Sequence, residues 1–316
     1  MPPFVAALVA AFSAALVLTP LVRYLARSRG LLDEPDERKI HDVAIPRLGG
    51  IAIAAAFYLG LAAALVLGSS SGISTGDESR LLAVLIGAAL IVCIGVVDDL
   101  FGIRARVKLL AQVGIGVVVG LLGLSIEFLD GPWGHATLGF LAVPVTVVWF
   151  VVVMNAINLI DGLDGLASGV VLIAMSAFYL IAAGAGLPPS LAALLGAGAG
   201  AVLGFLPFNF FPATITMGDT GSILLGFVVA AAAVTVTQTG SPGAAPWVPV
   251  LVLALPLIDT AWAIIRRTLA RAPLFAPDKL HVHHRLLGLG ISQRAATFLL
   301  WGISAAAATA GLIVAR

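Results

Sequence analysis

The sequence predicts an all-α, polytopic integral membrane protein that forms a single domain over residues 1–316. Of its 316 residues, 60% are hydrophobic and only 10% are charged, whereas soluble domains carry about 25% charged residues. Long uncharged runs alternate with short polar loops, and no segment is long and polar enough to fold alone. The net charge of +1 gives no basic field that would attract nucleic acid.

The uncharged runs predict about ten transmembrane helices, because a bilayer core of about 30 Å needs about 20 apolar residues per helix. We divide the longer runs at clusters of Gly, Pro and Ser. The first span has no basic segment before it and is expected to be retained rather than cleaved as a signal. The expected spans are 4–22, 46–68, 80–97, 107–124, 137–155, 166–183, 190–207, 220–238, 246–265 and 295–314.

The basic residues predict the orientation of these spans. Fifteen of the 17 Lys and Arg residues fall in three of the five loops that would share one side of the membrane. Lys and Arg accumulate in cytoplasmic loops, so we expect these loops inside the cell and both termini outside. The five loops are 23–47, 98–108, 156–165, 208–219 and 266–294, and they also contain most of the chemically reactive side chains.

The most unusual of these loops, together with the end of the preceding span, carries Asn155, Asn158, Asp161 and Asp164 at every third position, between two uncharged runs. A spacing of three keeps helical neighbours on roughly one face. Two carboxylates at the edge of an apolar segment are costly unless they are paired, hydrated or bound to a metal. A helix cap followed by a glycine-rich turn is the simpler alternative, but a cap requires only one Asp or Asn.

Two further acidic motifs lie in other inside loops. Asp98 and Asp99 precede Lys108, and such a pair could bind a divalent cation or act as a base beside a cation; a solvated helix end is the alternative. Asp219 lies within Met217–Ser222, at the start of an expected span, where free helix N–H groups favour anions. The alternative is that Asp219 simply caps the helix. Hard oxygen ligands favour Mg²⁺ or Mn²⁺ over zinc.

A histidine cluster occupies the last inside loop. His281, His283, His284 and Arg285 could bind phosphates and sugar hydroxyls, although a zinc site or a solvated loop would use the same residues. The first inside loop, with Lys39 and His41, is a mixed charge run that could be plain surface. Asp259 is more simply interpreted as a helix anchor than as a catalyst.

Together, these motifs resemble the polyprenyl-phosphate N-acetylhexosamine-1-phosphate transferases over nearly the whole chain and in order. The loop Ile45-Pro46-Arg47-Leu48-Gly49 and the His-x-His-His form resemble the branch that uses UDP-N-acetylglucosamine. The Gly-Thr-Pro-Thr-Met-Gly-Gly string of the sister branch, which transfers phospho-N-acetylmuramoyl-pentapeptide, is absent. The matching blocks are Arg38-Lys39-x-His41 with Pro46-x-x-Gly49-Gly50, Gly95-x-x-Asp98-Asp99 with Lys108 and Gln112, Asn155 to Ala167, Gly218 to Ser222, Pro256-x-x-Asp259, and Pro277 to His284.

The resemblance implies a Mg²⁺-dependent enzyme in the bacterial plasma membrane. It would move a sugar 1-phosphate from a UDP-sugar to undecaprenyl phosphate and release UMP, at the start of a cell-wall or surface polysaccharide pathway. Its partners would be these two substrates and the lipid bilayer; a homodimer is left open. Asp219 and Asn158 would hold Mg²⁺. The catalytic residues would be Asp98, which would deprotonate or orient the lipid phosphate, and Asp99 and Lys108, which would support it. The remaining implied substrate-binding residues are Asn155, Asp161, Asp164, His281, His283, His284, Arg285, Lys39 and His41.

One position departs from the family pattern. Members usually carry an aromatic residue that stacks on uracil three positions before the aspartate that corresponds to Asp219, and this chain has Thr216. Stacking by Phe210 or Phe211 instead, or a weaker nucleotide preference, are the two explanations that the sequence allows.

Two other classes of function compete with the transferase. A transporter or lipid flippase would place polar residues near the membrane midplane, and only Asp259 hints at that. A structural subunit of an envelope complex would not need Asp98, Asp161, Asp164 and Asp219 together.

Overall fold

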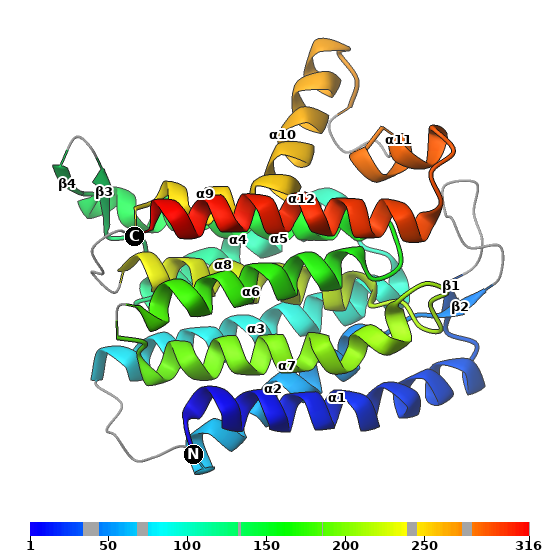
Figure 1. Ribbon diagram of the computed structural model, residues 1–316, viewed down its shortest axis with the longest axis horizontal. Coiled ribbons are helices and arrows are strands. Elements are labelled where there is room, and N and C mark those ends of the chain that lie inside the picture. Colours follow the sequence, from blue (N-terminus) through cyan, green and yellow to red (C-terminus); the bar gives the residue numbers. More distant parts are fainter. Residues whose placement is uncertain are drawn as a thin grey trace.

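The computed structural model describes residues 1–33, 44–67, 75–131, 134–184, 186–238, 245–273 and 280–315. Its long helices lie side by side in one bundle (Figure 1). The helices are α1 (Pro3–Ser28), α2 (Gly49–Leu67), α3 (Thr75–Phe101), α4 (Ala105–Leu121), α5 (Ala142–Ile160), α6 (Leu166–Ala183), α7 (Pro189–Asn209), α8 (Gly218–Gln238), α9 (Trp247–Val252), α10 (Ala254–Leu269), α11 (Val282–Gly288) and α12 (Gln293–Val314), with a 3-10 turn at Gly139–Leu141.

Helix α8 is the centre of the bundle. Its apolar window is completely buried, and it packs against α2, α3, α5 and α6. Small residues make this possible: a Cβ at Gly226 would lie 2.7 Å from the Cα of Met154 on α5. Because α8 is surrounded by protein, its polar first turn can be held by side chains from several other helices.

Helices α1 and α7 approach each other through a stripe of small residues. A Cβ added at Gly196, Gly200 or Gly204 would lie within 2.5 Å of a backbone oxygen of α1. This spacing of four residues keeps the stripe on one helix face, and small residues at such spacing drive helix association in membranes. The contact fixes α7 and therefore the loop that follows it, which leads to α8.

The span prediction is confirmed in type, but the exact number is not. Among the described residues, eight helices are long and apolar enough to cross a membrane, and α4 has only 17 residues. The expected span 246–265 is wrong as one helix, because the chain breaks at Leu253 between α9 and α10. Pro256 lacks the N–H that would bond to the carbonyl of Val252, four residues earlier. Helix α10 consequently projects away from the bundle (Figure 1).

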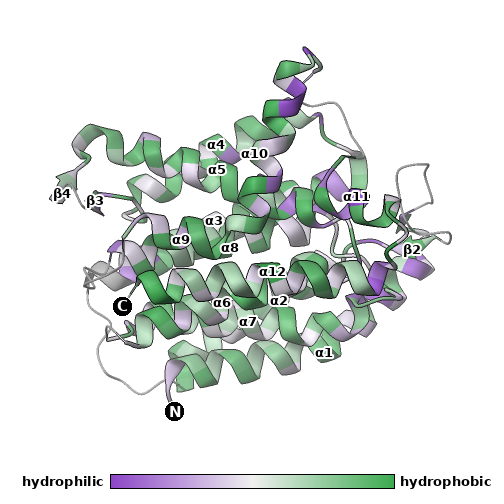
Figure 2. Ribbon diagram, turned by 45° about the horizontal axis from the view of Figure 1, so that its top comes forward, coloured by the Kyte–Doolittle hydropathy of each residue, from purple (hydrophilic) through white to green (hydrophobic). Residues whose placement is uncertain are grey.

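Two antiparallel hairpins mark opposite ends of the bundle (Figure 1). At one end, β1 (Leu32–Asp33) pairs with β2 (Ile45–Pro46). At the other end, β3 (Phe128–Gly131) pairs with β4 (Gly134–Thr137). Figure 2 shows that the hydrophilic residues gather near β2 and α11 and at the outer tip of α10, while the bundle itself is mostly hydrophobic. The reactive residues therefore belong to the end marked by β1 and β2.

Candidate active site

The first turn of α8 brings together acidic residues from distant parts of the chain. Lys108, on α4, contacts a carboxylate oxygen of Asp98 on α3 and one of Asp219 on α8. Asp98 also accepts a hydrogen bond of 2.7 Å from the backbone N–H of Ile103, and its side chain is almost completely buried. A single ammonium group thus holds two carboxylates that would otherwise repel each other.

Asp99 has a different task from its neighbour Asp98. Its side chain is fully buried and accepts hydrogen bonds from the backbone N–H groups of Asp219 at 2.9 Å and Thr220 at 3.0 Å, and from the Thr220 hydroxyl at 2.6 Å. It caps α8 from another helix, as a carboxylate at a helix N-terminus should. The geometry makes Asp99 a support for Asp219 rather than a group that reaches substrate.

The two asparagines of α5, Asn155 and Asn158, have different hydrogen-bond partners. The Asn158 amide donates hydrogen bonds to Asp219 Oδ1 at 2.9 Å and to the Ser222 hydroxyl at 2.8 Å. The Asn155 amide donates instead to Gln112 Oε1 at 2.6 Å and to the carbonyl of Val151. Asn158 therefore lies beside Asp219, while Asn155 lies one turn deeper, where it ties α5 to α4.

The loop between α5 and α6 carries the remaining two aspartates. Asp164 is buried and accepts a hydrogen bond of 2.8 Å from the backbone N–H of Ala213, so it joins this loop to the one before α8. Asp161 follows the last residue of α5. Burial, and then repulsion from Asp219, Asp164 and Asp99, raise the pKa of Asp161 well above its ordinary value. The site carries more negative charge than its own cations balance.

Asp259 holds the histidine segment next to the α5–α6 loop. This buried residue of α10 accepts hydrogen bonds from the backbone N–H of Val282 at 2.9 Å, and its Oδ2 lies 2.7 Å from His281 Nδ1. Asp259 therefore anchors the start of α11 through His281 and Val282. This fits the interpretation of Asp259 as a helix anchor. His283 is buried against Gly162, where an added Cβ would lie 2.1 Å from its Nε2.

Burial and the neighbouring His284 and His281 lower the pKa of His283 to about 3. This shift favours the neutral imidazole, so His283 would contact a substrate through hydrogen bonds rather than through charge. Of the three histidines of this segment, only His284 lines the cavity beside Asp219. Arg285 is exposed and is not part of the cavity wall. Lys39 and His41 lie outside the described residues.

These elements enclose a polar cavity of about 270 Å³. Its walls come from β1, the residue after β2, the ends of α5 and α7, the α5–α6 loop, the start of α8 with the segment before it, and α11. The lining residues are Asp33, Arg47, Asn158, Asp161, Gly162, Leu163, Asp164, Asn209, Thr216, Met217, Gly218, Asp219 and His284.

The cavity wall bears on the two explanations for Thr216. Thr216 lines the cavity, as its sequence position implies, but neither phenylalanine does. Phe210 packs on Phe298 and Trp301 with ring centroids 5.6 and 5.7 Å apart, and the Arg294 guanidinium lies 5.4 Å above the Phe211 ring. The structure therefore gives no support to Phe210 or Phe211 as the replacement for the stacking aromatic residue.

The donor atoms of the cavity fit a hard divalent cation that is shared with a substrate. Carboxylate and amide oxygens of Asp219, Asn158 and Asp161 are the ligand types that Mg²⁺ prefers. Within the described part of the chain, no group of three or more acidic, His or Cys residues could hold a metal ion alone. Mg²⁺ usually binds through one or two carboxylates plus substrate phosphates, so the residues fit an ion of that kind.

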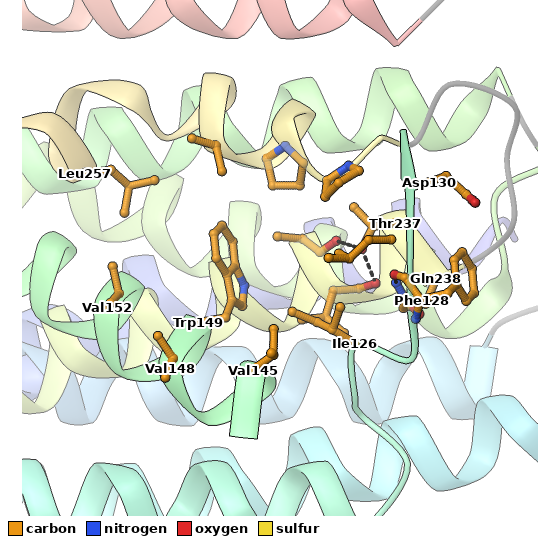
Figure 3. Close-up of a pocket in the computed structure, with 16 residues that line it drawn as sticks. Ile126, Phe128, Asp130, Val145, Val148, Trp149, Val152, Thr237, Gln238 and Leu257 are labelled. Carbon is orange, nitrogen blue, oxygen red and sulfur yellow. Dashed lines mark hydrogen bonds between the residues drawn. The ribbon is translucent and has the colours of Figure 1, made fainter. Parts of the chain in front are cut away.

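A second cavity lies at the opposite end of α8 and is almost entirely apolar (Figure 3). Its volume is about 370 Å³, and Trp149, Val145, Val148 and Val152 of α5 line one side. Gln238 accepts hydrogen bonds from the N–H groups of Glu127 and Phe128 and so fixes the start of the β3–β4 hairpin beside it. This cavity offers no cluster of charges for chemistry.

Sequence reasoning missed three polar residues of the cavity wall, Asp33, Arg47 and Asn209, and Arg47 is the only cation among them. Arg47 was noted only as part of a branch motif, yet its Nε lies 3.0 Å from Asp99 Oδ1 and its side chain lines the cavity. The sequence shows only that Arg47 stands two positions before the Gly49-Gly50 pair, and this position does not reveal its contact with Asp99.

Comparison with known proteins shows the family of this chain. Residues 81–237 match the model of glycosyl transferase family 4. The chain is 37% identical over 301 residues to a probable undecaprenyl-phosphate N-acetylglucosaminyl 1-phosphate transferase of Bacillus subtilis, covering 94% of this chain and 81% of the relative. It is 35% identical to the decaprenyl-phosphate N-acetylglucosaminephosphotransferase of Mycobacterium tuberculosis, covering 89% and 74%.

A third relative is more distant. The undecaprenyl-phosphate alpha-N-acetylglucosaminyl 1-phosphate transferase of Escherichia coli K12 is 29% identical over 301 residues, covering 92% of this chain and 78% of the relative. The helices and these likenesses identify a multi-pass membrane protein, and the chain belongs to glycosyl transferase family 4, the polyprenyl-phosphate sugar-1-phosphate transferases that its motifs resemble.

Proposed function

We propose that the protein transfers N-acetylglucosamine 1-phosphate from UDP-N-acetylglucosamine to undecaprenyl phosphate, which yields a polyprenyl-diphosphate sugar and UMP. The names of the relatives support the polyprenyl phosphate acceptor and the transferred group. The structural observation that carries the proposal is the contact of Lys108 with both Asp98 and Asp219 at the edge of the polar cavity. Another UDP-N-acetylhexosamine, or the phospho-N-acetylmuramoyl-pentapeptide donor, would use the same chemistry.

The main barrier to this reaction is repulsion between two anionic phosphates, so positioning and electrostatics carry most of the catalysis. Asp219 and Asn158 would bind Mg²⁺, which would supply positive charge to the donor diphosphate. Asp98 would orient the lipid phosphate or accept its proton, and Lys108 would neutralise charge that develops between the phosphates. A phosphate monoester has a second pKa of about 6, so much of the acceptor is already deprotonated at neutral pH.

The proposed orientation places the polar cavity in the cytoplasm, where UDP-sugars are available, and both termini outside. The positive residues of the inside loops support this orientation. The cavity lies at the end of the bundle where hydrophilic residues gather (Figure 2). A lipid phosphate held at the bilayer surface could therefore meet a soluble nucleotide sugar there.

A direct assay tests the proposal. Purified protein is incubated with undecaprenyl phosphate, Mg²⁺ and UDP-N-acetylglucosamine labelled in the sugar, and both the lipid phase and UMP are measured. We expect equal amounts of labelled lipid and UMP, and a loss of both when EDTA removes the metal. Label that stays in UDP-N-acetylglucosamine, with neither labelled lipid nor UMP formed, would contradict the proposal. A panel of UDP-sugars in the same assay identifies the donor.

A further inference from the structure

The segment Ile45–Gly50 is held against the start of α8 by backbone hydrogen bonds. The N–H of Thr216 donates to the carbonyl of Pro46, and the N–H of Gly49 donates to that of Thr216, both at 3.0 Å. The N–H of Gly50 donates to the carbonyl of Met217 at 2.8 Å. The contact is so close that a Cβ at Gly50 would lie 2.2 Å from the backbone nitrogen of Gly221. The segment therefore moves only with the turn that carries Asp219.

The same segment contains a strained residue. Leu48 is buried and has a φ of 83°, a left-handed conformation that costs a residue with a side chain about 1–3 kcal/mol. Such strain persists only where the surrounding structure enforces it, and it is concentrated at functional sites. Here it turns the chain directly after Arg47, so that the arginine and the glycine pair can both contact the α8 turn.

The side chain of Arg47 lines the polar cavity and is held in place by an ion pair. Its Nε lies 3.0 Å from Asp99 Oδ1, and Asp99 also holds the backbone of Asp219 and Thr220. Its Nη1 lies 3.8 Å from Asp33 Oδ1, a looser contact, and one third of the side chain remains exposed. Among the described residues that line this cavity, Arg47 is the only lysine or arginine, against four aspartates.

We propose that Arg47 binds the phosphate oxygens of a substrate in this cavity. The strained turn at Leu48 and the ion pair with Asp99 together hold its guanidinium in place for that purpose. A guanidinium anchored through Nε still presents N–H groups that match the paired oxygens of a phosphate. This inference rests on the proposed function, which supplies two phosphate-bearing substrates, the donor diphosphate and the lipid phosphate.

Three variants test the inference: Arg47→Gln, Arg47→Lys, and Arg27→Gln as a matched control with the same change of charge on the exposed face of α1. KM is measured separately for UDP-N-acetylglucosamine and for undecaprenyl phosphate, and binding of UDP-N-acetylglucosamine and of uridine is measured by calorimetry. A hydrogen-bonded charge pair of this kind contributes about 10- to 100-fold in affinity. We expect Arg47→Gln to raise one substrate's KM by that factor, with a smaller change in kcat.

The substrate whose KM rises identifies which phosphate Arg47 binds. If it is the donor, uridine should bind to the variant as tightly as to the wild type, because uridine has no phosphate. Arg47→Lys is expected to keep the fold by pairing with Asp99 but not to restore KM, because its one ammonium cannot serve both partners. Unchanged KM values in Arg47→Gln, or complete rescue by lysine, would overturn the inference. A wild type that makes no labelled lipid would instead refute the proposed function.

Discussion

The two ends of α8 differ in nearly every property that matters for chemistry. At its first turn, Asp219 lies among Asp98, Lys108 and Asn158, beside a polar cavity with four aspartates in its wall. At its last turn, Thr237 and Gln238 border an apolar cavity, and Gln238 bonds to backbone groups. Both cavities are large enough to hold part of a ligand. The difference teaches that volume alone does not locate a reaction; converging charges and hydrogen bonds do.

The strongest test of this contrast is the loss of Asp219. We expect Asp219→Ala to lower kcat by at least about 10³-fold, because it removes the carboxylate that would hold the metal and the partner of both Lys108 and Asn158. Turnover is measured with labelled UDP-N-acetylglucosamine, and the melting temperature in detergent shows whether the variant is folded. Near-normal Mg²⁺-dependent turnover in the folded variant would refute the role of Asp219.

Asp98 should have a smaller and different effect. We expect Asp98→Asn to lower kcat by about 10²-fold or more, the range of a lost general base, while KM for the nucleotide sugar changes much less. The comparison of kcat and KM by steady-state kinetics separates this role from donor binding. An unchanged kcat would rule out Asp98 as a base or as the group that orients the acceptor.

Asp259 tests whether the histidine segment belongs to the polar end. We expect Asp259→Ala to raise KM for the donor by about tenfold, because His281 and α11 lose the carboxylate that anchors them. The loss of hydrogen bonds to a carboxylate costs about that factor. Asp259→Asn, which can keep one of these hydrogen bonds, should lose less. Equal KM values in wild type and Asp259→Ala would show that the position of α11 does not affect the donor.

Asp161 gives a prediction about stability and pH. Its raised pKa means that the folded state binds this proton more tightly than the unfolded state, so stability is lost as pH rises from the unfolded pKa of about 3.9 through the raised value. Asp161→Asn should therefore raise the melting temperature at pH 8 by about 2–4 °C and less at pH 5. Mg²⁺ should stabilise the wild type more than the variant. A variant that melts earlier at pH 8 would contradict the charge imbalance.

The smallest effect is expected at the other end of α8. Val148→Phe adds volume beside the apolar cavity that Trp149 also lines (Figure 3), so it should leave the dissociation constant of UDP-N-acetylglucosamine within about twofold, the range of a substitution outside the binding site. Calorimetry measures this constant directly. A large loss of donor affinity would mean that the two ends are not functionally separate.

The sequence predicted the helical bundle well because length and apolarity set membrane spans almost alone. It predicted that Asp98, Asn158, Asp161 and Asp219 would be neighbours, since their loops share one side. The family resemblance gave Asp99 a supporting role beside Asp98, but only the position of α8 shows that Asp99 gives this support by capping that helix. The sequence predicted one helix over 246–265, since the break at Leu253 depends on where Pro256 falls in the hydrogen-bond ladder.

The roles of the histidines were equally hidden from the sequence. Spacing alone cannot show that His281 pairs with Asp259, 22 positions earlier, or that His283 packs against Gly162. Arg47 was missed for the same reason: its meaning depends on Asp99 and on the strained Leu48, and both are properties of the folded chain.

The central claim is that the polar cavity at the first turn of α8 binds the nucleotide sugar, and a structure of the protein with UDP-N-acetylglucosamine and Mg²⁺ tests it most directly. We expect the diphosphate to lie beside Asp219 and Asn158, with the nucleotide along the wall that contains Thr216 and Asp164. A nucleotide found in the apolar cavity near Trp149, or anywhere away from Asp219, would contradict the account.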